Sequence, residues 1–148
     1  MIQEDEQLLS KDLCARLPYG VICSIYRIDD DGVGWRNEKL TGHFSTGYAN
    51  EFYFGINPLS VDDVSKIKPY LRPMSSMTEE EKEKYHSLCY EEEREVFEYG
   101  EWVTRVYYHD TIDSIDYLNS IHIDYRGLIE KGLAIEVTED NNPYKLEE

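Results

Sequence analysis

Residues 21–56 read VICSIYRIDDDGVGWRNEKLTGHFSTGYANEFYFGI, and this stretch decides the fold class. It contains three runs rich in β-branched and aromatic residues, at 21–28, 35–44 and 51–56, separated by turn formers such as the DDDG of 29–32. Runs of this kind between turn signals are typical of antiparallel strands. We therefore predict three or four strands in an antiparallel β meander, which could also close into a small barrel.

The segments that flank this stretch have different patterns. Leucines recur at helical spacing before it, and the pattern stops at Pro18 and Gly20, so we predict a short helix over residues 10–17. After it, Pro69 and Pro73 predict a stiff, extended connector.

The C-terminal half begins with a helix signal. Thr78 and Glu81 have the spacing of a capping box, in which each side chain accepts a backbone N–H of the other residue. Apolar residues then keep helical spacing as far as Gly100, a natural residue to end a helix. The acidic segment 78–100 is therefore predicted to form one or two helices.

The last 48 residues contain four further elements in this interpretation. Residues 101–108 are dense in β-branched and aromatic residues and predict a strand, and a helix capped by Asp110 or Thr111 follows. Asp124 is expected to cap a short helix over 125–131, and residues 133–137 are expected to be extended.

These elements predict one α+β domain over residues 1–148. A β-rich lobe covers about residues 18–72, a helix-rich C-terminal lobe covers about 76–137, and a disordered tail covers about 138–148. If the two lobes are separated by a boundary, it lies at residues 68–77.

Charge is unevenly distributed along the chain. The 31 Asp and Glu residues outnumber the 15 Lys and Arg residues and leave a net charge of −16. Residues 1–77 hold 11 acidic and 8 basic residues, residues 78–101 hold 10 and 3, and residues 102–148 hold 10 and 4. The middle segment is therefore either a solvated acidic face or a surface for a basic partner.

The totals also exclude several classes of function. Such a surplus of acid disfavours direct binding to nucleic-acid phosphates. No apolar run approaches the roughly 18 residues that a membrane helix needs, and residues 1–17 lack the pattern of a signal peptide. Three cysteines without CxxC spacing predict no disulfide framework and no zinc site, so we expect a cytoplasmic protein without a metal or cofactor.

One short motif is a candidate for catalysis. His122, Asp124 and Arg126 lie within five residues, and such a group could serve a small hydrolase or nuclease-like enzyme with a divalent metal. The structural alternative is simpler: Asp124 caps a helix, Arg126 pairs with an acid such as Asp116, and His122 packs in a loop. Nucleotide-binding loops and a nucleophile elbow are absent from the sequence.

Two surfaces are candidates for binding a partner. The aromatic residues of segment 35–54 either fill a barrel core or leave an exposed patch. The acidic segment supplies a row of carboxylates. The residues chosen from these two surfaces are Glu91, Glu92, Glu93, Glu95, Glu98, Trp35, Tyr48 and Tyr53.

Three stretches resemble a family of small uncharacterised proteins from gut-bacterial genomes and their prophages. They are residues 12–21 (DLCARLPYGV), 68–81 (KPYLRPMSSMTEEE) and 116–134, which contains HIDYRGLIEKGLA. The resemblance implies association with phage or mobile elements and carries no activity, cofactor or catalytic residue.

Together these observations predict a non-enzymatic accessory protein that binds a protein partner, possibly a basic one, through an acidic helix and aromatic hairpins. The alternatives are the enzyme centred on His122, Asp124 and Arg126, and a structural phage component that self-assembles.

Overall fold

The computed structural model describes residues 3–29, 32–45, 50–55, 57–60 and 66–147. It has a mixed α+β fold, as predicted. The helices are α1 (Gln3–Arg16), α2 (Glu79–Leu88) and α3 (Ile112–Ser120). The strands are β1 (Ile22–Asp29), β2 (Gly32–Lys39), β3 (Gly42–Ser45), β4 (Asn50–Phe54), β5 (Asn57–Ser60), β6 (Ile67–Pro73), β7 (Tyr90–Glu98), β8 (Glu101–His109), β9 (Ile123–Asp124) and β10 (Ile135–Glu136).

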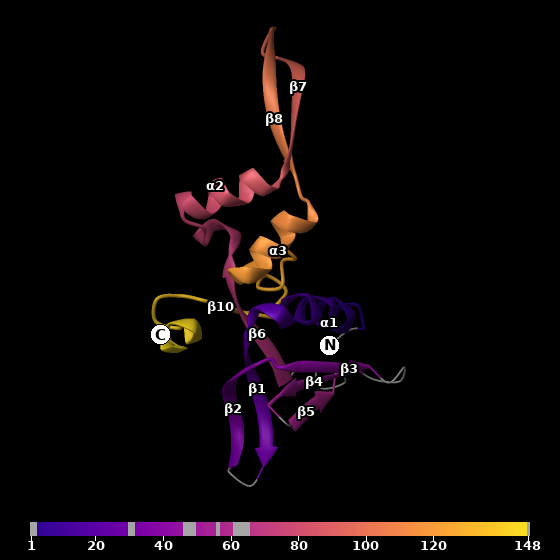
Figure 1. Cartoon of the computed structure of the whole chain (residues 1–148), viewed down its shortest axis with the longest axis vertical. Coiled ribbons are helices and arrows are strands. Elements are labelled where there is room, and N and C mark those ends of the chain that lie inside the picture. The colour runs from indigo at the N-terminus through magenta and orange to yellow at the C-terminus, as the bar shows by residue number, and fades with distance from the viewer. Residues whose placement is uncertain (1–2, 30–31, 46–49, 56, 61–65, 148) are drawn as a thin grey trace.

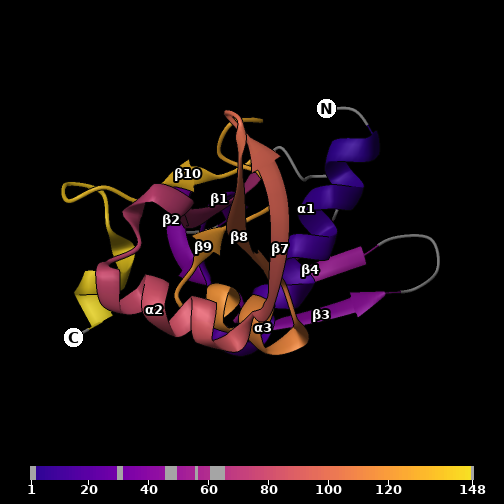
Figure 2. The same cartoon turned by 90° about the horizontal axis from the view of Figure 1, so that it is seen from above.

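The molecule is elongated. Two N-terminal sheets and α1 form the lower body, α2 and α3 lie above them, and the hairpin of β7 and β8 projects from the top (Figure 1). Viewed down the long axis, the hairpin stands over the body, with α1 and the C-terminus on opposite sides (Figure 2).

The N-terminal strands form two sheets. One has the order β10-β6-β1-β2, with β9 also paired to β6, and the other has the order β3-β4-β5. Antiparallel pairing of β1 with β2, and of β3, β4 and β5 in sequence, agrees with the predicted meander. As far as the chain is described, these two sheets are open and do not close into a barrel.

The predicted proline connector is instead an internal strand of the first sheet. Proline lacks an N–H to donate, which normally confines it to sheet edges. Here β6 changes neighbours along its length: Pro69 lies opposite Cys23 of β1, the next two residues pair with β10, and Pro73 lies opposite Asp124 of β9. Each proline therefore removes an N–H donor from only a short run of pairing between two strands.

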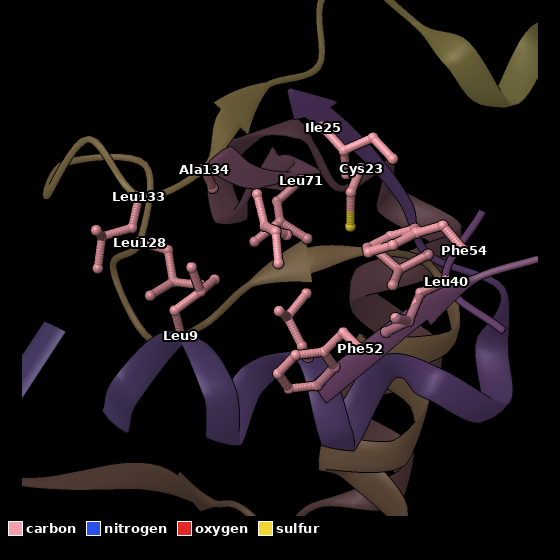
Figure 3. Packing of buried hydrophobic residues seen from close by; sticks show 13 residues of the cluster. Leu9, Cys23, Ile25, Leu40, Phe52, Phe54, Leu71, Leu128, Leu133 and Ala134 are labelled. Atoms are coloured by element: carbon pink, nitrogen blue, oxygen red, sulfur yellow. The ribbon is translucent and has the colours of Figure 1, made fainter. Parts of the chain in front are cut away.

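The main core lies where α1 meets both sheets. Leu9 and Leu13 of α1 are fully buried against Cys23 of β1, Leu71 of β6 and Phe52 of β4. Figure 3 shows Leu9 of the helix and Leu71 of the sheet converging with Leu128 of the C-terminal loop. The N-terminal helix is longer than predicted: it begins at Gln3, the first described residue, whereas its first buried leucine, Leu9, lies directly before Ser10.

A second, smaller cluster supports the upper part of the molecule. Met77, Leu118 and Ile123 are buried together, so the start of α2, the end of α3 and β9 are packed as one unit. The predicted capping box of Thr78 and Glu81 begins α2. Of the two residues proposed to cap the next helix, Thr111 is the N-cap of α3, where it forms a capping box with Ser114. This unit forms the base from which the hairpin projects.

The helix-rich C-terminal lobe is not what the structure contains. Helix α2 ends at Leu88, and residues 90–98, predicted as helical, form β7 and pair along their whole length with β8. The predicted strand at 101–108 is confirmed as β8. Helical spacing of a few apolar residues in 85–99 misled the prediction, because the same residues also match partners across a hairpin.

Two further expectations in the C-terminal region are corrected. Residues 125–131 form turns, not a helix, although Asp124 does accept N–H groups as a cap would, from Leu128 (3.0 Å) and Ile129 (2.9 Å). The segment expected to be disordered is folded back as far as residue 147. There the Tyr144 hydroxyl donates to the Tyr70 carbonyl (2.7 Å) and accepts from the Ile22 N–H (3.1 Å).

Candidate protein-binding arm

The hairpin of β7 and β8, residues 90–109 and here called the arm, turns on Tyr99 and Gly100. Glu98 and Glu101 lie opposite each other, so the loop has two residues. Both have positive φ, 51° at Tyr99 and 84° at Gly100, which is the pattern of a type I′ turn. Glycine adopts this backbone readily, but a bulky residue in it is unusual and costs about 1 kcal/mol or more.

Tyr99 gains no packing in return for this strained conformation. Its side chain is fully exposed (101%) at the tip of the arm. Asn is the residue that a type I′ turn usually places there. A strained aromatic residue without a contact of its own points to a role outside the fold of the single chain.

The arm is joined to the body at its base alone, among the described residues. The ring of Tyr108 stacks on His86 of α2, with centroids 4.1 Å apart and planes 8° from parallel. The Thr111 hydroxyl donates to the carbonyl of Leu88 (2.7 Å), and the Tyr85 hydroxyl donates to Asp110. Burial and this hydrogen bond raise the pKa of Tyr85. These contacts position the arm at its base, and none of its residues 90–109 is buried.

One face of the arm pairs most of its own charges, and we call it the paired face. Its side chains alternate along the strands with those of the opposite face. Glu92 forms ion pairs with Arg94 and His109, and the guanidinium of Arg94 lies 4.8 Å from the centroid of the Tyr107 ring. Further out, Arg105 pairs with Glu98. The hydrogen bond from Arg94 lowers the pKa of Glu92, so this carboxylate stays ionised.

The opposite face, here called the open face, carries glutamates but no basic side chain. Within the described chain, Glu91, Glu93 and Glu95 form no ion pair, although they stand in a row on β7. Next to this row lie exposed aromatic side chains: Phe97 (61%) and Trp102 (70%) meet edge to face, 5.5 Å apart. The open face is completed by Thr104, Val106 and Tyr108 of β8. It therefore combines uncompensated carboxylates with apolar surface.

The structure separates the predicted partner-binding residues. Glu91, Glu93 and Glu95 lie on the open face, whereas Glu92 and Glu98 are held by arginines on the paired face. Trp35 is in β2 at the other end of the molecule, packed against Tyr26 with ring centroids 5.6 Å apart (Figure 1). Tyr53 is half-buried in β4, and Tyr48 lies outside the described residues. The two predicted surfaces are therefore not one site.

Sequence reasoning missed the aromatic residues of the arm. The signal that could have found them is a mirror symmetry around the turn, in which VFE (96–98) and EWV (101–103) flank Tyr99 and Gly100. Such symmetry places Val opposite Val and Phe opposite Trp in a hairpin, as the structure has them. The residues missed are Phe97, Tyr99, Trp102, Val106 and Tyr108.

The candidate catalytic residues do not converge. His122 has φ 63°, and its ring stacks on Tyr144 with centroids 3.9 Å apart. Asp124 is buried and accepts the two backbone N–H groups already described. The shallow hollow that His122 lines includes neither Asp124 nor Arg126. This geometry gives the enzyme alternative no support.

Arg126 has a structural partner far away in the sequence. Its guanidinium pairs with Asp12 of α1 (2.8 Å), not with Asp116, and lies 4.7 Å from the centroid of the Tyr125 ring. Asp12 also pairs with Arg16 (2.8 Å), and the side chains of both are fully buried. Arg126 therefore belongs to an ion-pair network that ties α1 to the C-terminal loops.

Among the described residues, no group of three His, Cys, Asp or Glu side chains could hold a metal ion. The helices in the described part of the chain are all too short or too polar to cross a membrane. Comparison with protein-family models, with curated proteins and with solved structures gave no match.

Proposed function

We propose that this chain is a non-enzymatic accessory protein whose arm binds a basic protein partner. The observation that carries the proposal is the open face, where Glu91, Glu93 and Glu95 stand unpaired beside the exposed rings of Phe97 and Trp102. Exposed Trp and Tyr residues are the commonest anchors of protein interfaces.

The arm contributes little that a stable fold would need. A two-stranded hairpin buries too little surface to be stable alone, and its exposed rings bury only a minor part of their apolar area in the single chain. An apolar patch held away from the body is typical of an interaction surface. Binding a partner would bury these rings, and burial of their apolar area would stabilise the complex.

Charge favours a basic partner. The three carboxylates of the open face repel one another and would be relieved by Lys or Arg side chains of a partner. The net charge of −16 adds long-range attraction for a basic surface, which would speed association and weaken as salt is added. A protein surface that normally binds nucleic acid fits this description, and duplex DNA would then compete for it.

The resemblance to prophage proteins is consistent with an arm that is carried on a base shared by those proteins. Its two longer motifs, residues 68–81 and 116–134, flank the arm in sequence and contribute Met77, Leu118 and Ile123 to the second cluster. The motifs would thus build the base, and the arm between them would bind. Association with phage or mobile elements, and a cytoplasmic location that suits the three free cysteines, are parts of this proposal.

The experiment is capture of the partner by tagged protein in the native host, at low and high salt. A variant with Glu91, Glu93 and Glu95 changed to Lys should lose a partner that the wild type holds at low salt. Its matched control changes three exposed acids of the C-terminal region, Glu130, Glu139 and Asp140, to Lys, which alters the net charge equally. Equal loss in both variants, or no loss in either, would contradict the proposal.

A further inference from the structure

The arm has two outer edges whose backbone groups have no partner strand in the described chain. In a two-residue turn the Glu98 carbonyl accepts from the Glu101 N–H, and inward and outward groups then alternate along each strand. The N–H groups of Trp102, Thr104, Val106 and Tyr108 therefore point outward from β8, and every second residue of β7 does the same.

The two edges differ in how they are protected. Charged residues along an edge strand discourage another strand from pairing with it. Strand β7 carries five glutamates and one arginine, whereas β8 carries one glutamate at its start and one arginine, among Trp, Val, Thr and Tyr. The edge of β8 is long, apolar and unguarded.

We propose that two copies of this chain associate by antiparallel pairing of β8 with β8, centred on Thr104. The central residues WVTRV (102–106) are self-complementary in this register. Thr104 lies opposite Thr104 of the second copy, and Trp102 lies opposite Val106 of the second copy. Thr–Thr pairs and aromatic pairs with β-branched residues are favourable across strands, and this register places no like charges opposite each other.

The same arrangement keeps the acidic strands apart. The joined sheet has the order β7, β8, β8, β7, so the two rows of glutamates lie three strand spacings, about 14 Å, from each other. That distance exceeds the Debye length of about 8 Å at physiological salt. Pairing through β7 would instead align glutamate with glutamate, which explains why the acid residues are concentrated on one strand.

The register also gives the exposed tip a contact. Thr104 is five residues from Tyr99 and five from His109, so the tip of each arm reaches the base of the other. Beyond His109 lies an open hollow lined by Asp110, Thr111, Ile112, Ile115 and Asp116. Ile112 is 81% exposed there. A tyrosine ring from the second copy would cover this apolar side chain, which accounts for the strained and exposed Tyr99.

The dimer places both open faces on the same side of the four-stranded sheet, because the two-fold axis runs through Thr104 perpendicular to the sheet. It is independent of whether the open face binds a basic partner. Salt separates the two ideas: added salt screens the repulsion between two chains of −16 and strengthens the dimer, whereas it weakens capture of a basic partner.

The first test is sedimentation equilibrium of the purified protein over about a hundredfold range of concentration. Thr104→Pro removes an outward N–H from the edge of β8 and should abolish the dimer. Glu95→Pro is the matched control, since Glu95 lies directly opposite Thr104 and removes an outward N–H from the other edge. It should dimerise like the wild type.

The second test does not depend on tolerance of proline. A hydrogen-bonded antiparallel pair has Cα atoms about 5.5 Å apart, a distance that a disulfide can span. In a background with Cys14 and Cys89 changed to Ser, Thr104→Cys should form a disulfide-linked dimer under mild oxidation at least about tenfold faster than Glu95→Cys. A wild type that stays monomeric throughout, or Thr104→Cys and Glu95→Cys variants that crosslink at equal rates, would overturn the proposal.

Discussion

The guanidinium of Arg72 holds the carboxylate of Glu81 at two points, with Nη2–Oε1 2.6 Å and Nη1–Oε2 2.9 Å. Arg72 lies near the end of β6 and Glu81 in the first turn of α2, so the pair fastens the base of the arm to the main sheet. Bidentate geometry and partial burial make this contact stronger than an ordinary surface ion pair. It links the core to the part of the chain that we propose binds partners.

This ion pair predicts a dependence of stability on pH. The hydrogen bond from Arg72 lowers the pKa of Glu81 from its ordinary 4.5 to about 2. The folded state therefore binds this proton less readily than the unfolded state. The pKa difference corresponds to about 3.4 kcal/mol, which solvent screening of this partly exposed pair reduces to about 2 kcal/mol. This contribution is complete above pH 4.5 and lost as the pH falls towards 2. Urea unfolding at a series of pH values measures it. Glu81→Gln should flatten the acid limb of the curve, and Glu83→Gln, at an exposed acid, should leave it unchanged.

The turn of the arm predicts opposite effects on stability and on binding. Asn tolerates positive φ better than Tyr, so Tyr99→Asn should stabilise the arm by about 0.5–1 kcal/mol. Amide hydrogen exchange within β7 and β8 measures this gain. The same substitution removes the exposed ring and should weaken self-association, whereas Tyr99→Phe should preserve it. Faster exchange in the Asn variant would show that the turn is not of the assigned type.

The two tryptophans form a matched pair for the binding proposal. Both are exposed, Trp102 (70%) on the open face and Trp35 (51%) in β2 at the far end of the molecule. Trp102→Ala should reduce partner capture about tenfold or more, as expected for an interface anchor. Trp35→Ala should capture the partner like the wild type. The reverse ranking would move the binding surface to the β1 and β2 hairpin.

The buried ion pairs of α1 predict a large effect on stability. Asp12 accepts from both Arg16 and Arg126, and the Arg16 side chain is fully buried. Asp12→Ala leaves a buried guanidinium uncompensated and should destabilise the fold by about 3–5 kcal/mol in chemical denaturation. Glu79→Ala breaks an exposed pair with Lys82 and should change stability by less than about 0.5 kcal/mol. Comparable losses in the two variants would show that the network contributes little.

The sequence predicted those elements whose signal and whose structure lie within a few residues of each other. The capping box at Thr78 predicted the start of α2, and the choice of Asp110 or Thr111 as a cap predicted the start of α3 to within one residue, because each cap satisfies donors three residues away. The runs of β-branched residues predicted β1, β4 and β8 for the same reason, since each depends on its own side chains fitting an extended backbone.

Tertiary structure decided the rest, because it depends on contacts between residues far apart. Arg126 could have paired with any nearby acid, and only the fold brings it to Asp12, 114 residues away. Residues 90–98 match a helix almost as well as a strand, and pairing with β8 decided the outcome by giving each residue a partner across the hairpin. That pairing also divided the acidic residues between two faces. The sequence alone determined that the segment is acidic and aromatic, and the hairpin determined which of those side chains remain unpaired.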